Sequence, residues 1–125
     1  DGPGFTIPAG GYAVIAKDIT VYMAEYGPPP FGVSILGPYT GSLSNGGEKL
    51  ELSMPGDEDE YGTRYYIRID RINYSDGSHD SDAPGGVDLW PVEADGGGKS
   101  LTRTVPADYG NDPDNWTAQD PSPGE

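Results

Sequence analysis

The sequence predicts an all-β fold, a sandwich of short strands with long ordered loops and one short helix. Several short apolar runs are separated by Gly, Pro and Asn turn signals, a pattern typical of sandwiches. Glycine (20) and proline (13) exceed a quarter of the 125 residues, whereas nine tyrosines and two tryptophans oppose disorder. Because the hydrophobic fraction is only 34%, we expect a compact domain with a thin core.

The first predicted elements are a strand, a helix and a second strand. The first strand, over residues 12–16, follows a Pro/Gly turn. The helix, near residues 18–26, has Asp18 as its N-cap and Gly27 as its stop. Its apolar residues recur at helical spacing: Ile19, Tyr22, Met23 and Tyr26. After the extended "GPPPFG" loop, "FGVSILGPY" predicts a short strand.

The stretch "GSLSNGGEKLEL" predicts a turn followed by a strand. Its Asn-Gly-Gly run, residues 45–47, is interpreted as supplying the positive φ values of a tight turn. In "EKLELSM", Leu50, Leu52 and Met54 alternate with charged or polar residues. We therefore expect a half-buried antiparallel strand whose leucines fill the core.

The run "RYYIRIDRINY" carries the strongest β signal, but its apolar positions change parity. One set, Tyr65, Ile67 and Ile69, shares a face, whereas Ile72 and Tyr74 belong to the opposite parity. A β-bulge near Asp70–Arg71 would bring both sets to the core. Beyond it we expect loops interrupted by short strands.

The charge balance excludes several partners. Seven Lys and Arg residues against 21 Asp and Glu residues give a net charge of −14, which opposes binding to nucleic acid and to anionic membranes. The charge suits solubility, adaptation to high salt, or cation binding. There are no cysteines, so disulfides and thiolate chemistry are excluded. The sequence shows no signal peptide and no membrane-spanning run, and we expect it to be part of a larger protein.

No catalytic constellation is predicted, and we expect a protein that is not an enzyme. The single histidine, His79, lies in a polar Gly/Ser/Asp loop, whereas a triad base needs a shaped pocket. Many carboxylates are present, but no pair is singled out for acid–base work. The two tryptophans, Trp90 and Trp116, are expected to pack in the core, with a carbohydrate platform as the alternative.

Calcium is the one candidate cofactor. The run "DGSHDSD" places oxygen ligands at alternate positions, namely Asp76, Ser78, Asp80 and Asp82. A second acidic cluster is "DEDE" at residues 57–60. The EF-hand spacing is not met, because the sixth position from Asp76 is Ser81 and the twelfth is Val87. Simple solvation of these acidic loops is the alternative.

Several motifs in order resemble one family. They are "FTIPAGGYAVIAKD", "GSLSNGGEKLEL", "IDRINYSD", "LWPVEADGGGKSLTR" and "NDPDNWTAQDPSPG". Together they resemble the prokaryotic branch of the lamin tail domain family, over nearly the whole chain. The resemblance implies an immunoglobulin-like β-sandwich without a catalytic centre. It also implies an accessory module of a secreted or cell-surface prokaryotic protein.

The resemblance completes the prediction for the whole chain. Residues 1–125 are expected to form one lamin-tail-like domain that lacks the family's first strands. The predicted function is a structural, protein-interaction module that contacts other chains by strand addition at an open sheet edge or by self-assembly. The Ile/Tyr-rich strand around Tyr65–Tyr74 would supply the contacts. The alternative is a calcium- or carbohydrate-binding accessory module.

Overall fold

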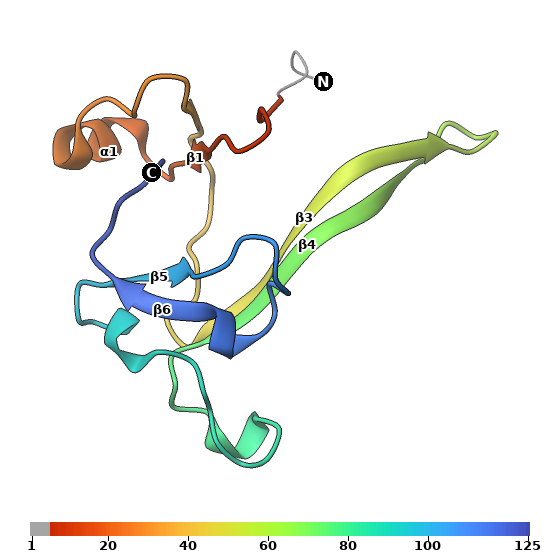
Figure 1. The fold of residues 1–125 in the computed structure, drawn as a ribbon. Coiled ribbons are helices and arrows are strands. Elements are labelled where there is room, and N and C mark those ends of the chain that lie inside the picture. The colour runs from red at the N-terminus through yellow and green to blue at the C-terminus, as the bar shows by residue number, and fades with distance from the viewer. Residues whose placement is uncertain (1–5) are drawn as a thin grey trace. The chain divides into compact units, whose positions relative to one another are not determined.

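The computed structural model describes residues 6–125, which form two compact units: residues 6–42 with 122–125, and residues 43–121. Six strands, one α-helix and three 3-10 helices make up the described elements, so the β-rich class is confirmed (Figure 1). The strands pair as three two-stranded sheets. The arrangement of the strands as two facing sheets remains a prediction, and so does the expectation of a single domain.

The first unit is a small β–α–β motif. Strands β1 (Ala13–Ile15) and β2 (Ser34–Leu36) pair in parallel, and α1 (Ile19–Tyr26) connects them. The helix has the predicted bounds, because Asp18 Oδ1 accepts hydrogen bonds from the first-turn N–H groups of Thr20 and Val21, at 2.8 and 3.1 Å. Parallel pairing differs from the antiparallel sheets of an immunoglobulin-like sandwich, and a helical crossover is what parallel neighbours require.

A small apolar cluster holds this unit together. Val14, Ala16 and Tyr22 are buried, with three partly buried neighbours packed against them: Ile19, Val33 and Ile35. The Tyr22 hydroxyl also donates to the carbonyl of Pro123, 3.5 Å away, which ties the C-terminal residues to the same unit. The thin core that the composition predicts is therefore observed here.

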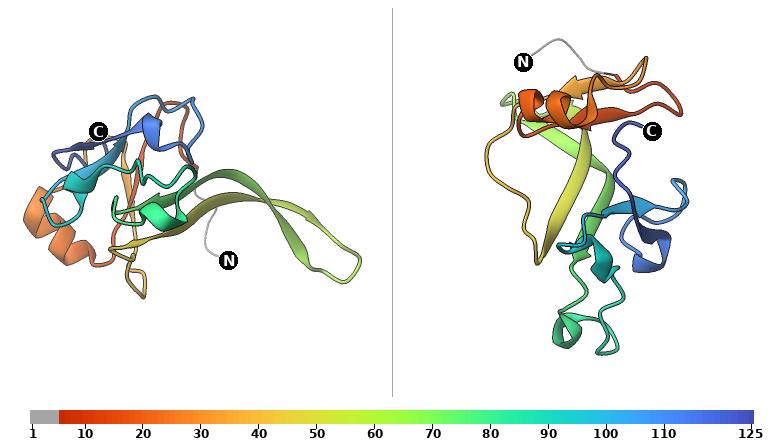
Figure 2. Two further views of the ribbon diagram at one scale, coloured as in Figure 1. Left: turned by 90° about the horizontal axis from the view of Figure 1, so that it is seen from below. Right: turned by 90° about the vertical axis from the view of Figure 1, so that its left-hand side faces the viewer.

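The second unit contains a long antiparallel ribbon, which we call the arm. It consists of β3 (Gly47–Glu58) and β4 (Arg64–Ser75), and its far end stands clear of the rest of the unit (Figures 1 and 2). Asp59 shapes the connecting turn, because its Oδ1 accepts the N–H groups of Tyr61 and Thr63, both at 2.9 Å. The acidic cluster at residues 57–60 is thus part of a hairpin turn.

The predicted bulge is present, one residue earlier than expected. Leu52 pairs with Asp70 and Ser53 pairs with Arg68, so Ile69 is the extra residue. Across the bulge, Leu50 stays opposite Ile72, and Met54 stays opposite Ile67. Ile67 and Ile72 are therefore brought to one face as the sequence predicts, whereas Ile69 is the bulged residue and Asp70 lies opposite Leu52.

The prediction that the apolar side chains of the alternating pattern fill the core is wrong. Leu50, Leu52 and Met54 are 38%, 57% and 46% exposed, and Ile67 is 51% exposed. Within residues 43–121 these apolar side chains are left largely uncovered, although Arg103 forms an ion pair with Asp70, which lies opposite Leu52. Gly47 is the only member of the Asn-Gly-Gly run with a positive φ, and it begins β3 where a Cβ atom would lie 2.3 Å from the Tyr74 carbonyl oxygen.

The remaining elements surround the base of the arm. Strands β5 (Ser100–Arg103) and β6 (Trp116–Gln119) form an antiparallel pair, and short 3-10 helices cover residues 80–82, 92–94 and 113–115. Trp90 is buried and packs on Trp116 with ring centroids 6.1 Å apart, as expected for core packing. No helix formed by residues 6–125 has the length and apolar character needed to cross a membrane.

Candidate functional site

The loop after β4 brings three metal-ligating side chains together. Asp76, His79 and Asp88 each offer a donor atom, and these atoms lie within 4.8 Å of one another. Asp76 Oδ1 lies 3.1 Å from His79 Nδ1. Asp88 approaches from the far end of the loop, where its Oδ2 accepts the backbone N–H of His79 at 3.1 Å.

Backbone N–H groups and hydroxyls explain why the carboxylates converge. Asp76 accepts both the N–H and the hydroxyl of Ser78, at 2.9 and 2.6 Å. Asp88 accepts the Ser75 hydroxyl at 2.5 Å and the Trp90 N–H at 3.2 Å. These bonds satisfy polar groups in a loop that carries little apolar packing.

The predicted calcium ligands occupy different places in this loop. Asp76 belongs to the three-residue group, and Ser78 serves as its hydrogen-bond donor. Asp80 instead accepts the backbone N–H of Asp88 at 2.8 Å, in the 3-10 helix that also contains Asp82. Among residues 6–125, Asp80 and Asp82 lie outside the group of converging donors. The calcium ligand set stays a prediction.

The hydrogen bonds favour the ionised carboxylates. Donation from the side chain and backbone of Ser78 lowers the pKa of Asp76, with the nearby charge of His79 adding to the effect. Burial works to raise the pKa of Asp88, but hydrogen bonds from Ser75, Trp90 and His79 outweigh it, and the net pKa is lowered. Both carboxylates therefore remain charged near neutral pH.

The cluster does not have the geometry of a catalytic triad. Ser75 Oγ lies 3.2 Å from His79 Nδ1, the same nitrogen that contacts Asp76. A Ser–His–Asp triad places the nucleophile and the carboxylate on opposite ring nitrogens, so that one nitrogen can take the proton of the nucleophile while the carboxylate accepts the N–H of the other and orients the ring. In addition, the Ser75 hydroxyl donates to Asp88 rather than to the imidazole.

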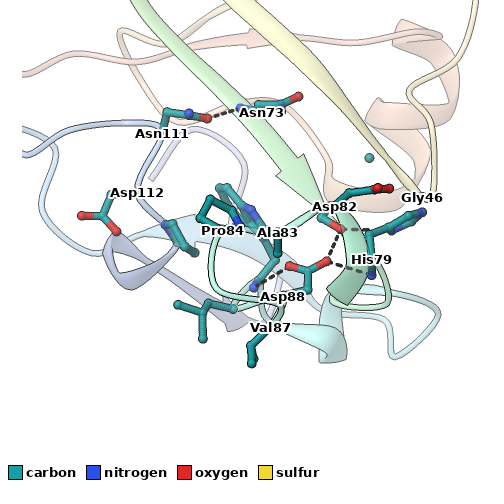
Figure 3. A pocket seen from close by; sticks show the side chains of 15 residues that line it. Gly46, Asn73, His79, Asp82, Ala83, Pro84, Val87, Asp88, Asn111 and Asp112 are labelled. Atoms are coloured by element: carbon teal, nitrogen blue, oxygen red, sulfur yellow. Dashed lines mark hydrogen bonds between the residues drawn. The ribbon is translucent and has the colours of Figure 1, made fainter.

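An open pocket of about 690 Å³ adjoins the cluster. Its polar lining includes His79, Asp82, Asp88 and Asp112, and its apolar lining includes Trp90. Figure 3 shows Asp88 beside His79 on one side of this pocket and Asn111 directed toward Asn73 on another. The 2.6 Å hydrogen bond from the Asn73 N–H to Asn111 Oδ1 fixes the loop against β4.

The arm is the second candidate site, because its two faces differ in chemistry. Residues directly opposite in the ladder share a face, so one face is mostly apolar: it carries Leu50, Leu52, Met54, Ile67 and Ile72, with Asp70 opposite Leu52. The other face carries Lys49, Glu51, Arg68 and Arg71. Glu51 lies 3.8 Å from both Lys49 and Arg68, so this face is adapted to water.

The two edges of the arm also differ. At the base, Asn111 binds the Asn73 N–H, and Gly110 lies so close that a Cβ atom there would be 2.9 Å from the Arg71 carbonyl oxygen. Pro55 removes one N–H from β3 and so interrupts its row of donors. The outer half of β4, residues 64–68, contains no proline and is the more complete edge for an added strand.

Sequence reasoning missed two residues that organise the second unit. Asp88 is separated from Asp76 by eleven residues. Its one local signal is that an aspartate can accept the backbone N–H of the residue two positions later, here Trp90. Asn115 is buried and binds the backbone of Val105 through both amide atoms.

Comparison with known proteins adds no assignment. No family model, no curated protein and no solved structure matches the chain. The resemblance to lamin tail domains therefore stays a prediction.

Proposed function

We propose that this chain is a non-catalytic structural module that binds other protein chains through the arm. The exposed apolar face of the arm carries this proposal. A two-stranded ribbon is only marginally stable in water unless a further strand or layer covers it. Burying one aliphatic side chain of this size is worth about 1.5–3 kcal/mol. A partner covering the face would therefore stabilise both the complex and the arm.

Strand addition is the second way in which a partner can use the arm. The outer half of β4 presents backbone groups at its edge, and Tyr65, Tyr66 and Ile67 lie along it. An added strand would pair its backbone there and turn the ribbon into a wider sheet. We propose that an immunoglobulin-like sandwich is completed in this way, consistent with the lamin-tail resemblance.

The proposed setting is a secreted or cell-surface protein of a prokaryote. The family resemblance supports this setting, and the strongly acidic composition suits a module that must stay soluble at high salt. The absence of a catalytic role is supported by the single histidine, whose Nδ1 contacts both Ser75 and Asp76.

Self-association and peptide binding test the proposal. As a probe we choose a neutral peptide of alternating leucine and serine, about as long as the 12-residue strand β3. We expect the wild-type chain to self-associate or to bind this peptide, and the Leu52→Ser/Ile67→Ser variant to do neither. Leu43→Ser removes an equally exposed leucine outside the arm and is expected to behave as wild type. A wild-type chain that stays monomeric and binds no peptide contradicts the proposal.

Divalent-cation binding is a second candidate function. It is favoured by the convergence of one imidazole and two carboxylates at Asp76, His79 and Asp88. A mixed nitrogen and oxygen donor set suits a transition ion such as Zn²⁺ better than calcium, which prefers oxygen alone. The ion would displace the existing hydrogen bonds of Asp88 to Ser75 and His79.

Calorimetric titration with Zn²⁺ and Ca²⁺ in separate experiments tests this candidate. We expect Zn²⁺ to release heat and to raise the melting temperature, and Asp88→Asn to abolish both effects. The control is Asp95→Asn, an exposed aspartate outside the three-residue group. Equal responses of the two variants would show that the group does not hold the ion. A response to Ca²⁺ that Asp80→Ala removes would instead support the ligand set predicted from the sequence.

A further inference from the structure

The arm combines its apolar face with an acidic tip. Four consecutive acids, residues 57–60, end β3 and begin the hairpin turn. Glu58 forms an ion pair with Arg64, and Asp59 accepts N–H groups of the turn. Within residues 6–125, Asp57 and Glu60 form no ion pair or hydrogen bond through their side chains. The tip therefore presents negative charge that nothing in its own unit neutralises.

A second copy of the chain fits this surface poorly. A ribbon of 12 residues is roughly 40 Å long and two strands wide, so two arms packed face to face would bury roughly 800 Å² in total. Stable interfaces bury about 1,200–2,000 Å². Each copy also carries a net charge of −14, which opposes association.

A cationic partner removes the charge repulsion and adds contacts at the tip beyond those of the apolar face. Positive side chains beside Asp57 and Glu60 would add favourable charge contacts at the end of the apolar face, and the overall charge would speed the encounter. Resting on the proposed function of the arm, we infer that its partner is a segment of another protein that is apolar along its length and basic at one end. The apolar part lies on Leu52, Met54 and Ile67, and the basic end reaches the tip.

Matched peptides provide the test. One probe is the alternating leucine–serine peptide with three lysines at one end, and the other carries three glutamates instead; each is made with the charges at either terminus. Binding to the full chain is measured by fluorescence anisotropy in low and high salt. We expect a lysine peptide to bind at least about tenfold more tightly than the glutamate peptides, a difference that shrinks in high salt.

Variants locate the two contacts. Asp57→Asn/Glu60→Gln is expected to weaken lysine-peptide binding about fivefold or more, whereas Leu52→Ser/Ile67→Ser weakens binding of every peptide. Glu93→Gln/Asp95→Asn removes the same charge far from the arm in the sequence and is expected to leave the affinity unchanged. Circular dichroism shows whether each variant keeps its fold.

The outcomes separate the partner chemistry from the proposed function. If both peptide classes bind equally but depend on Leu52 and Ile67, the basic partner is overturned and the binding role of the arm stands. If the chain self-associates through the arm but binds no peptide, the basic partner is likewise overturned and the binding role of the arm stands. If Glu93→Gln/Asp95→Asn weakens binding as much as the tip variant does, the attraction is nonspecific and the inference is overturned. If the chain neither binds a peptide nor self-associates, both the basic partner and the proposed function of the arm are overturned.

Discussion

Asn115 anchors the segment before β6 with its side-chain amide. Its Oδ1 accepts the Val105 N–H at 2.9 Å, and its Nδ2 donates to the Val105 carbonyl oxygen at 3.0 Å. The side chain is buried, so water cannot replace these bonds. The Asn115 amide thus satisfies both backbone polar groups of Val105, as a neighbouring strand would do.

Replacing Asn115 therefore tests how much this unit depends on one residue. We expect Asn115→Ala to lower the free energy of unfolding by about 1–3 kcal/mol, because both polar groups of Val105 lose their partner. Urea unfolding followed by tryptophan fluorescence measures the change. Asn111→Ala removes a single bond, to Asn73, and is expected to cost about 1 kcal/mol or less. Equal effects of the two variants would contradict the role of burial.

The carboxylates of the loop after β4 predict a loss of stability in acid. The pKa values of Asp76 and Asp88 are lowered in the folded chain, by hydrogen bonds that outweigh burial at Asp88. A lowered pKa contributes stability above the ordinary aspartate value of about 4, and this contribution is lost as the pH falls through the folded value. We expect the melting temperature to fall below about pH 4, and to fall less steeply in Asp88→Asn. An unchanged slope in that variant, relative to Asp95→Asn, would contradict the assignment.

At the scale of elements, the arm differs from the other two sheets in its support. Its base is held by Asn111 and by Tyr74, whose hydroxyl donates to the Ser44 carbonyl oxygen at 2.7 Å. Its outer half, beyond the bulge at Ile69, has exposed side chains on both faces. The bulge keeps Ile67 and Ile72 on the same face as Leu50, Leu52 and Met54, which a regular ladder would not do.

Hydrogen exchange is expected to divide the arm at the bulge. Amides of residues 53–58 and 64–68 should exchange at least about tenfold faster than those of residues 48–51 and 71–74, because little apolar burial opposes opening of the outer half. Mass spectrometry of peptic fragments measures the rates. Protection that is uniform along the arm would contradict this division, and protection confined to the outer half on adding the lysine peptide would locate the partner.

At the scale of the whole molecule, net charge is the dominant property. The charge of −14 on 125 residues makes the folded chain repel itself, and salt screens this repulsion. We expect 0.5 M sodium chloride to raise the melting temperature by about 4 °C relative to low salt, the change that about 1 kcal/mol produces in a domain of this size. Tetramethylammonium chloride, which does not coordinate carboxylates, should act equally. A melting temperature that does not rise in either salt would contradict charge repulsion.

The sequence by itself determined the features that depend on neighbouring residues. The bounds of α1 follow from the Asp18 side chain, which accepts N–H groups two and three residues ahead, and from the glycine that ends the helix. The alternation of β3 and the bulge of β4 follow from the period of two in an extended strand. Such signals are local, and they need no knowledge of the fold.

Only the tertiary structure decided which surfaces are covered and which side chains meet. Alternation places Leu50, Leu52 and Met54 on one face, but whether another layer packs there depends on segments far away in the chain. Asp88 joins Asp76 and His79 because the loop closes through backbone N–H groups that donate to the carboxylates of Asp80 and Asp88, and no spacing rule encodes this closure. Burial and convergence are long-range properties, so the exposed arm and the three-residue group could be found only in three dimensions.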